Sequence, residues 1–535
     1  MSSAFSSRIT TLALLSNKFD EHSNSKRLQC LQSLSILPLP LGLQLVRYVE
    51  TLLFICAYPS NKKQYALAQQ EIHRITRLLQ QHRTKPLQKL WNTGLPFTPF
   101  VAKYSHDCIT WLHTHKSCRV EVEEFRDAQY SLNDILKHTL PTLEQAETTA
   151  GNSNQDLLDA LRVSHKQRLT FLLHELSKLN STPTIKDLLF DAMGMMIRVT
   201  PTSRDFSLAY NRMPVRSVYY HTTMRKRFDH AELLNTPLPV HQQLSTKEHK
   251  QLVTVIKNTM ALTNRETDPV TYLSEESLRY YQLECGISVA LFGITPERQL
   301  PLEQYIGYTL FKNGLPVAYG GSWVFGRSAK FGINVFEPYR GGESGYIMCQ
   351  LLRVYKQVFD IGTFEVEPYQ YGLDNPDGIA TGAFWFYYRF GFRPVDKKLY
   401  VLANSEYNKI KTKPTYRTSS KTLLRFTESN IALHLIKHTT PNLVTIMANV
   451  TRMISRTFNS NRQLAEQQCI AAFLTKTGIT APAEVYNKQV LTEVALWAAA
   501  SSITQPHTLK LLAEMIYIKP TDVYRYQQLL LNVFE

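Results

Sequence analysis

The chain has 535 residues, of which 44% are apolar and 19% are charged. This composition excludes a wholly disordered protein, and the length exceeds what one hydrophobic core supports, so two to four domains are expected. The formal net charge of +16 and the pI of about 9.3 favour contact with polyanions such as RNA, a nucleotide cofactor or anionic lipid. A solvated basic surface without a specific partner explains the charge equally well.

The cysteines and the apolar stretches indicate a cytoplasmic location. Seven cysteines are scattered without CxxC spacing, as reduced thiols are. The N-terminal residues lack a signal-peptide pattern, and the most apolar stretch, residues 35–59, is interrupted by Arg47 and Glu50. No transmembrane segment is therefore expected. No metal is expected either, since the spacing of Cys108, His113, His115 and Cys118 matches no common zinc module.

The first half of the chain has mainly helical periodicity. Apolar residues recur at spacings of three and four from about residue 31 to 137, which predicts an N-terminal helical region over residues 1–143. The polar residues 144–156 have the composition of a linker. Residues 157–279 read as a connecting region of helices and short strands, with strand candidates at 193–201 (MGMMIRVTP) and 214–221 (PVRSVYYH).

The pattern changes near residue 280. Four strand-like runs follow one another at residues 287–294, 305–314, 315–326 and 329–336, and Asn313-Gly314 is a strong hairpin signal. A helix at 344–359, a strand at 363–369 and an aromatic helix ending at Gly391 come next. From residue 404 the pattern is helical again, including 427–440 and 523–535. The sequence therefore predicts an α/β (α+β) fold, with a mixed sheet at 280–403 between helical regions at 1–143 and 404–535.

A glycine-rich turn at residues 340–345 connects the last of the four strands to the next helix. Apolar residues recur along residues 347–359, so one face of that helix is expected to pack on the sheet. Free backbone N–H groups and the helix dipole at such a turn hold phosphate groups. Glycine pairs also occur in ordinary tight turns.

A second motif lies about forty residues further on, and together the two resemble the GNAT superfamily of N-acyltransferases. That superfamily has a turn of the form R-G-x-G-x-G/A, which Arg340, Gly341 and Gly345 match. Its later helix often reads A-x-x-x-Y-x-K-x-G-F. The matching residues, with Arg in place of Lys, are Ala383, Tyr387, Arg389, Gly391 and Phe392.

The resemblance implies an acetyl-CoA or other acyl-CoA donor. The backbone of Asn334, Val335 and Phe336 would pair with the pantetheine arm, and the turn would hold the pyrophosphate. The turn residues concerned are Arg340, Gly341, Gly342, Ser344 and Gly345. Glu343 stands where the superfamily has a glycine, and its carboxylate would disfavour a pyrophosphate unless it turns away or pairs with a cation.

The resemblance also implies catalytic roles. Tyr387 would protonate the departing thiolate, and a carboxylate would take the proton of the attacking amine, with Glu337, Glu365 and Glu367 as candidates. Structural roles are the alternative, with Tyr387 in the core and the glutamates solvated.

The first functional hypothesis is therefore an acyltransferase that moves an acyl group from a CoA-type thioester to an amine acceptor. One alternative is a catalytically degenerate GNAT-like binding protein that uses its basic surface on RNA or another acidic partner. A further alternative is an aminoacyl-tRNA-dependent transferase.

Overall fold

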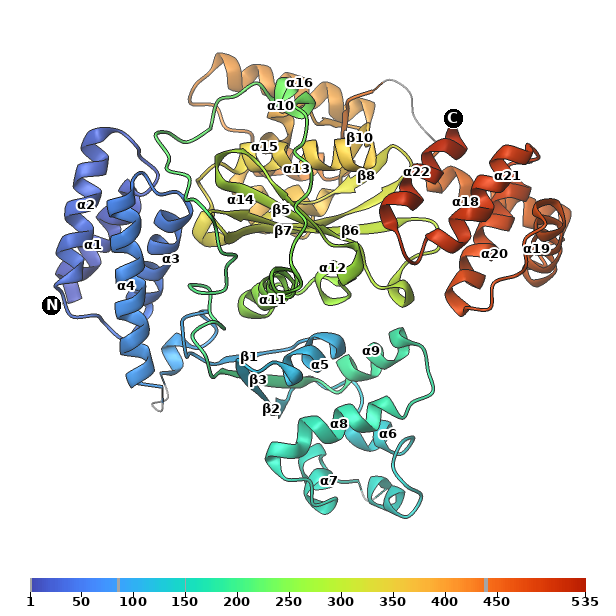
Figure 1. Cartoon of the computed structure of the whole chain (residues 1–535), viewed down its shortest axis with the longest axis horizontal. Coiled ribbons are helices and arrows are strands. Elements are labelled where there is room, and N and C mark those ends of the chain that lie inside the picture. The colour runs from blue at the N-terminus through green and yellow to red at the C-terminus, as the bar shows by residue number, and fades with distance from the viewer. Residues whose placement is uncertain (1, 84–86, 150, 437–440) are drawn as a thin grey trace.

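The computed structural model describes residues 2–83, 87–149, 151–436 and 441–535 (Figure 1). Residue 1, residues 84–86 of the predicted N-terminal helical region, residue 150 of the predicted linker and residues 437–440 of the predicted C-terminal helix lie outside the described residues. The described residues form a mixture of helix and sheet, organised around three hydrophobic cores.

A large mixed sheet forms the centre of the molecule (Figure 1). Its strand order is β11-β12-β10-β8-β7-β6-β5-β4, and β9 pairs with β7 beside this path. The strands are β4 Arg279–Gln282, β5 Ile287–Phe292, β6 Gln304–Lys312, β7 Leu315–Phe325, β8 Ser328–Phe331, β9 Asn334–Val335, β10 Thr363–Val366, β11 Arg393–Pro394 and β12 Ile431–His434. Strands β4 to β8 are antiparallel neighbours, whereas β8 and β10 are parallel.

Helices cover both faces of this sheet. In Figure 1, α11 (Thr246–Thr263) and α12 (Asp268–Thr271) lie on one side, and α13 (Ser344–Phe359) and α15 (Ala383–Arg389) lie on the other. The remaining helices of this part are α10 His230–Asn235, α14 Pro376–Thr381, α16 Lys397–Thr412 and α17 Ser420–Phe426. Helix α13 has the predicted bounds because Ile347, Leu351 and Tyr355 form an apolar stripe that is fully buried.

Four N-terminal helices share the core of the large sheet. They are α1 Ser2–Leu15, α2 Glu21–Ser35, α3 Leu43–Ala57 and α4 Lys62–Gln81. Helix α3 lies within the apolar stretch found in the sequence, and ten of its 15 residues are buried. No helix in the described ranges is both long enough and apolar enough for a bilayer crossing.

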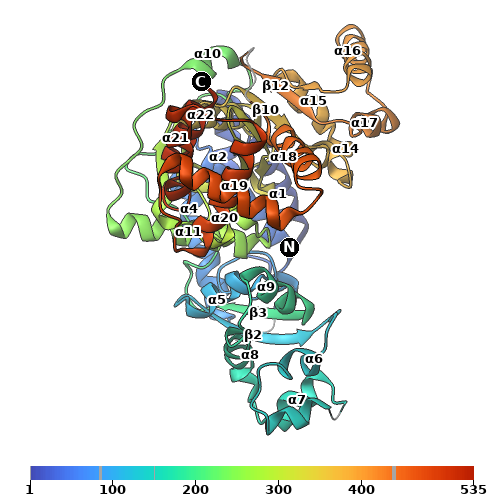
Figure 2. The ribbon, with the colours of Figure 1, turned by 90° about the vertical axis from the view of Figure 1, so that its right-hand side faces the viewer.

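A small α/β unit follows and projects away from the rest (Figure 2). Its antiparallel sheet has the order β1-β3-β2 and its own core. The elements are β1 Phe100–Ala102, α5 His106–Thr114, β2 Cys118–Phe125, α6 Leu132–Leu136, α7 Asn154–Ala160, α8 Arg168–Ser177, α9 Pro183–Ala192 and β3 Met195–Pro201.

Strand β3 confirms the candidate at 193–201, but β1 and β2 lie in the predicted helical region, and no strand forms at 214–221. The unit therefore spans the predicted boundary at residues 143–157.

The C-terminal helices form the third core. They are α18 Leu443–Thr457, α19 Arg462–Thr477, α20 Val485–Ala500, α21 Pro506–Ile518 and α22 Val523–Phe534. The prediction of a helix at 427–440 is wrong for residues 431–434, which form β12 between β10 and β11. The large sheet therefore extends past the predicted boundary at residue 403.

Candidate functional site

The parallel strands β8 and β10 separate after a short stretch of pairing. Ser328, Ala329 and Lys330 of β8 pair with residues 363–365 of β10. Beyond them, the next strand along the chain, β9, pairs only with β7, through Asn334 and Val335. The run FGINVF, predicted as one strand, is therefore interrupted at residues 332–333, and a gap opens between β9 and β10.

One edge of β9 is left open to this gap. The N–H of Phe336 donates to the carbonyl of Val317 on β7, at 3.0 Å. Because successive residues of a strand point their backbone groups in opposite directions, the N–H and C=O of Val335 face away from β7. The C=O accepts from Nε of Arg340 at 3.2 Å, and the N–H has no partner among the residues that the structure describes.

A cavity of about 1110 Å³ lies at this gap. Eight of the predicted site residues line it, namely Asn334, Val335, Phe336, Glu337, Arg340, Gly341, Ser344 and Tyr387. Gly342, Gly345 and Glu367 are not in its lining. The fold thus brings the two sequence motifs to one cavity, although they are separated by a helix and a strand.

The turn at residues 340–345 presents free backbone donors beside the cavity. Gly341 has a φ of +85°, a conformation that suits glycine, and a side chain there would meet open space. Helix α13 begins at Ser344 without a side-chain cap, and the N–H groups of Ser344, Gly345 and Tyr346 have no acceptor within the described residues. A Cβ on Gly345 would lie 2.5 Å from the ring of Phe390, so the helix start packs directly against the aromatic motif.

The carboxylate of Glu343 points away from the cavity and is fully buried. Its Oε2 lies 2.5 Å from Nζ of Lys312, and its Oε1 accepts from the N–H of Arg225 at 2.9 Å. Nε2 of His221 lies 3.8 Å away. Burial alone would raise the pKa of Glu343, but the contacts with His221, Lys312 and Arg225 outweigh it and lower the pKa to about 2. The negative charge of Glu343 is therefore paired with buried groups on the side of the turn that faces away from the cavity.

Tyr387 contributes a buried phenol to the cavity. It is 3% exposed, and its ring packs edge-on against Phe392 at 5.5 Å. Its hydroxyl has no hydrogen-bond partner in the described part of the chain, and burial raises the pKa of the phenol. A phenol that is protonated at neutral pH can serve as a proton donor.

The predicted carboxylates differ in position. Glu337 lines the cavity, with its side chain 67% exposed and 4.0 Å from Arg265. Glu367 lies outside the cavity lining and within 3.6 Å of Lys330, at 58% exposure. Glu365 accepts a hydrogen bond from Asn430. Glu337 is thus the predicted carboxylate that the structure brings near the turn.

Sequence reasoning missed Glu50 of α3, which also lines the cavity. Burial raises the pKa of Glu50, nearby Glu337 raises it further, and Arg47 acts in the opposite direction. The signal in the sequence was a single carboxylate within the apolar run LQLVRYVETLLFICA.

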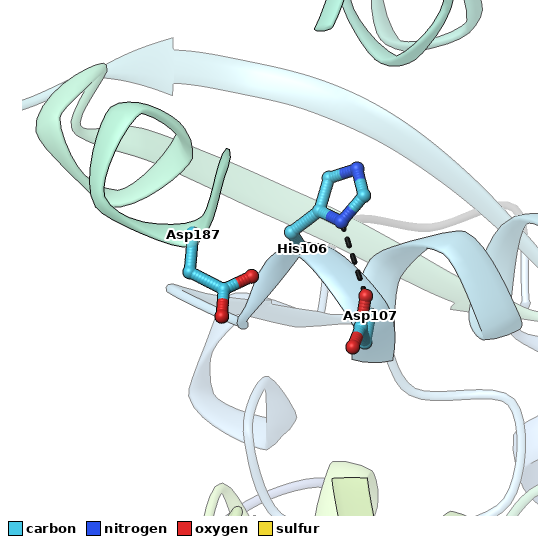
Figure 3. Close-up of side chains that lie close together, drawn as sticks. All are labelled: His106, Asp107 and Asp187. Carbon is cyan, nitrogen blue, oxygen red and sulfur yellow. Dashed lines mark hydrogen bonds and ion pairs between the residues drawn. The ribbon is translucent and has the colours of Figure 1, made fainter. Parts of the chain in front are cut away.

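A second group of polar side chains lies in the small unit (Figure 3). His106 and Asp107 of α5 and Asp187 of α9 have ligand atoms within 4.8 Å of one another. Arg298 donates to both carboxylates, with Nη2 at 2.9 Å from Oδ2 of Asp107 and 3.2 Å from Oδ1 of Asp187. Its guanidinium also stacks on the ring of Tyr272. Because Arg298 already bridges the two carboxylates, this cluster is an ion-pair clamp between the small unit and the large sheet.

The chain gave no match to a family model, a curated protein or a solved structure. The geometry of the cavity is therefore the feature that indicates a function.

Proposed function

We propose that the large sheet and its helices form a GNAT-like acyltransferase that moves an acyl group from a CoA-type thioester to an amine. The observation that carries this proposal is the cavity at the gap between β9 and β10. It has a free strand edge at Val335, an uncapped helix start at Ser344 and a buried phenol at Tyr387.

The free groups suit the parts of a CoA thioester. A pantetheine arm carries amides, which pair with a free strand edge as an added strand does. A pyrophosphate suits the start of α13, where Ser344 lines the cavity, the N–H groups of residues 344–346 have no acceptor among the described residues, and the helix dipole favours negative charge. Arg340 and Arg389 also line the cavity and add positive charge.

The chemistry then requires one proton donor for the leaving thiolate. The phenol of Tyr387 is protonated at neutral pH and is held by the packing of α15. Proton donation by a positioned side chain contributes about 10²–10⁴-fold to a rate.

Thermal unfolding with CoA thioesters tests the proposal. A ligand that binds only the native state stabilises it by about 2.7 kcal/mol at a hundred times its dissociation constant. We expect a rise in Tm with acetyl-, succinyl- or long-chain CoA, and a copurified CoA species in native mass spectrometry. No shift with any of the three would exclude the CoA form of the proposal.

A matched pair of variants at the start of α13 tests whether this turn binds the pyrophosphate. Ser344→Glu places a carboxylate at the first residue of α13, where it favours the helix but repels a pyrophosphate. We expect this variant to keep or raise the Tm of the free protein and to lose the shift with CoA. Ser344→Gln, which is neutral and similar in size, is the control and should retain the shift.

A second candidate function is RNA binding by the helical pair α16–α17, which projects from the molecule in Figure 2. Its basic side chains are exposed, and Glu406, which ion-pairs with Lys409, is the acidic residue among them. They are Lys397, Lys398, Lys409, Lys411, Lys413, Arg417, Lys421 and Arg425. Tyr400, at 42% exposure, offers a ring for base stacking.

Salt dependence tests this second function. Binding to single-stranded RNA should weaken as the salt concentration rises, since counterions are released from the phosphates. Replacing Lys398, Lys413 and Lys421 by serine should lower the affinity and the salt slope. The same change at Lys62, Lys63 and Lys510, which are also exposed, is the control. An affinity that does not respond to salt would count against this surface.

A further inference from the structure

The cavity extends beyond the residues that we propose to bind the acyl-CoA, and other parts of the chain enclose it there. Glu50 and its neighbours on the same stripe of α3, Val46 and Leu53, form one wall. The start of the small unit, including Asn92 and residues 100–102, forms another. The end of α11, from Thr263 to Arg265, completes it. Three separate parts of the chain thus enclose this half of the cavity, which we call the α3 chamber.

Two carboxylates, Glu50 and Glu337, lie at the α3 chamber together with the cation Arg265, and Arg47 also acts on Glu50. Glu50 has no ion pair or hydrogen bond with any described residue, although its side chain is half-buried between Val46 and Leu53. Glu337 lies close enough to influence it, and the contact of Glu337 with Arg265 is long, at 4.0 Å, between two exposed side chains. An exposed pair of this kind contributes little to stability, so Glu337 remains available to a second cation.

A half-buried carboxylate without a partner is unfavourable in its charged form, and a cationic ligand would stabilise that form. The phenol of Tyr387 adds a second unpartnered polar group in the same cavity, at 3% exposure. Glu50 of α3 and Tyr387 of α15 come from distant parts of the chain and meet at this cavity.

We propose that the α3 chamber binds the acceptor, that the acceptor is an unbranched aliphatic diamine, and that Glu50 receives the proton of its reacting nitrogen. This inference rests on the proposed acyltransferase function and names its acceptor class. Glu50 and Glu337 supply one carboxylate for each nitrogen, and Val46 and Leu53 supply an apolar surface for the methylene chain.

The transfer step balances with the groups present. The acceptor arrives as an ammonium, because alkylamines have a pKa near about 10.4. Glu50 takes one proton, the free nitrogen attacks the acyl carbon, and the C–S bond breaks as the C–N bond forms. Tyr387 donates its proton to the thiolate, and the phenolate recovers one proton from the amide nitrogen through solvent. The products are an N-acyl amine and a thiol, with one proton released to water from Glu50.

The full-length protein saturated with acetyl-CoA tests the inference, with putrescine as the diamine and n-butylamine as the matched monoamine. Putrescine should raise the Tm further and release free thiol. Glu50→Gln should keep the shift with acetyl-CoA, lose the shift with putrescine and lower kcat/KM for putrescine about 100-fold. Glu21→Gln, an exposed carboxylate in the first turn of α2, is the control and should match the wild type.

The outcomes separate the two proposals. If none of acetyl-, succinyl- and long-chain CoA gives a shift in the wild type, the acyltransferase proposal fails and this inference fails with it. If acetyl-CoA binds but Glu50→Gln processes putrescine as the wild type does, the role of Glu50 is wrong and the acyltransferase stands. Equal use of n-butylamine and putrescine would overturn the diamine assignment.

Discussion

Lys312 at the end of β6 and Glu343 in the glycine-rich turn form an ion pair of 2.5 Å, and neither side chain is exposed to solvent. The rings of Tyr58 and Tyr219 flank the ammonium, at 5.1 and 5.8 Å. The pair thus ties the turn to the sheet from below and leaves its upper face free of negative charge from residue 343.

We expect Lys312→Met to destabilise the protein by about 3–5 kcal/mol, because it leaves the carboxylate of Glu343 buried without its cation. Urea unfolding measures this loss. The exposed pair Lys330–Glu367 offers a control, and Lys330→Met should cost less than about 1 kcal/mol. A double variant, Lys312→Met with Glu343→Leu, should recover most of the loss, and equal losses for the single and double variants would contradict the coupling.

The same pair predicts how stability changes with pH. The pKa of Glu343 is lowered from 4.5 to about 2 on folding, so the ionised carboxylate stabilises the native state. This contribution is fully present above pH 4.5 and is lost as the pH falls toward 2. Glu343→Gln should therefore be less stable than the wild type at neutral pH, and the difference in Tm should narrow in acid. A constant difference would exclude this linkage.

Two adjacent tyrosines of α15 test the catalytic role proposed for Tyr387. Tyr387→Phe removes a hydroxyl that lines the cavity, and it should lower turnover about 10²-fold or more while the Tm shift with CoA remains. Tyr388→Phe removes a hydroxyl that donates to Asn404 outside the cavity. It should cost about 1 kcal/mol of stability and leave turnover unchanged. Similar turnover in both variants would remove Tyr387 from the mechanism.

The clamp at Arg298 predicts a change in domain attachment. Arg298→Met leaves the carboxylates of Asp107 and Asp187 facing each other without their shared cation. We expect faster limited proteolysis between the small unit and the large sheet, with the C-terminal bundle unaffected. Arg525→Met, which breaks the exposed contact with Glu514, is the control and should leave the cleavage rate unchanged.

The sequence predicted the local elements of the sheet well. The hairpin at Asn313-Gly314 is confirmed, with φ values of 47° and 81°, because a two-residue turn of this kind needs both residues in the left-handed region. Strand β12 was predicted as helix because its short apolar run fits either periodicity, and the pairing with Phe364 that decides it is distant in sequence. In β2, the alternation of Cys118, Val120 and Val122 indicates a strand. The prediction missed this strand because the segments on both sides have helical periodicity.

Some residues of the candidate site could also be predicted from the sequence, and others could not. The turn and Tyr387 could be found in the sequence because each lies in a local motif. Glu50 could not, because its place beside Glu337 depends on how the N-terminal helices pack on the sheet. The buried partners of Glu343 could not be predicted from the sequence either, since Lys312 and Arg225 come from separate parts of the chain.

Strand β12 lies late in the chain, so the large sheet cannot be completed until β12 has been synthesised. The ribosome delivers β10 well before β12, and the helical pair α16–α17 emerges between them. Until then β10 has one unpaired edge, which is a template for pairing with other chains. A nascent chain that pauses between these two strands would therefore be most prone to aggregation there, and a chaperone that recognises exposed strand edges would have its strongest effect in that interval.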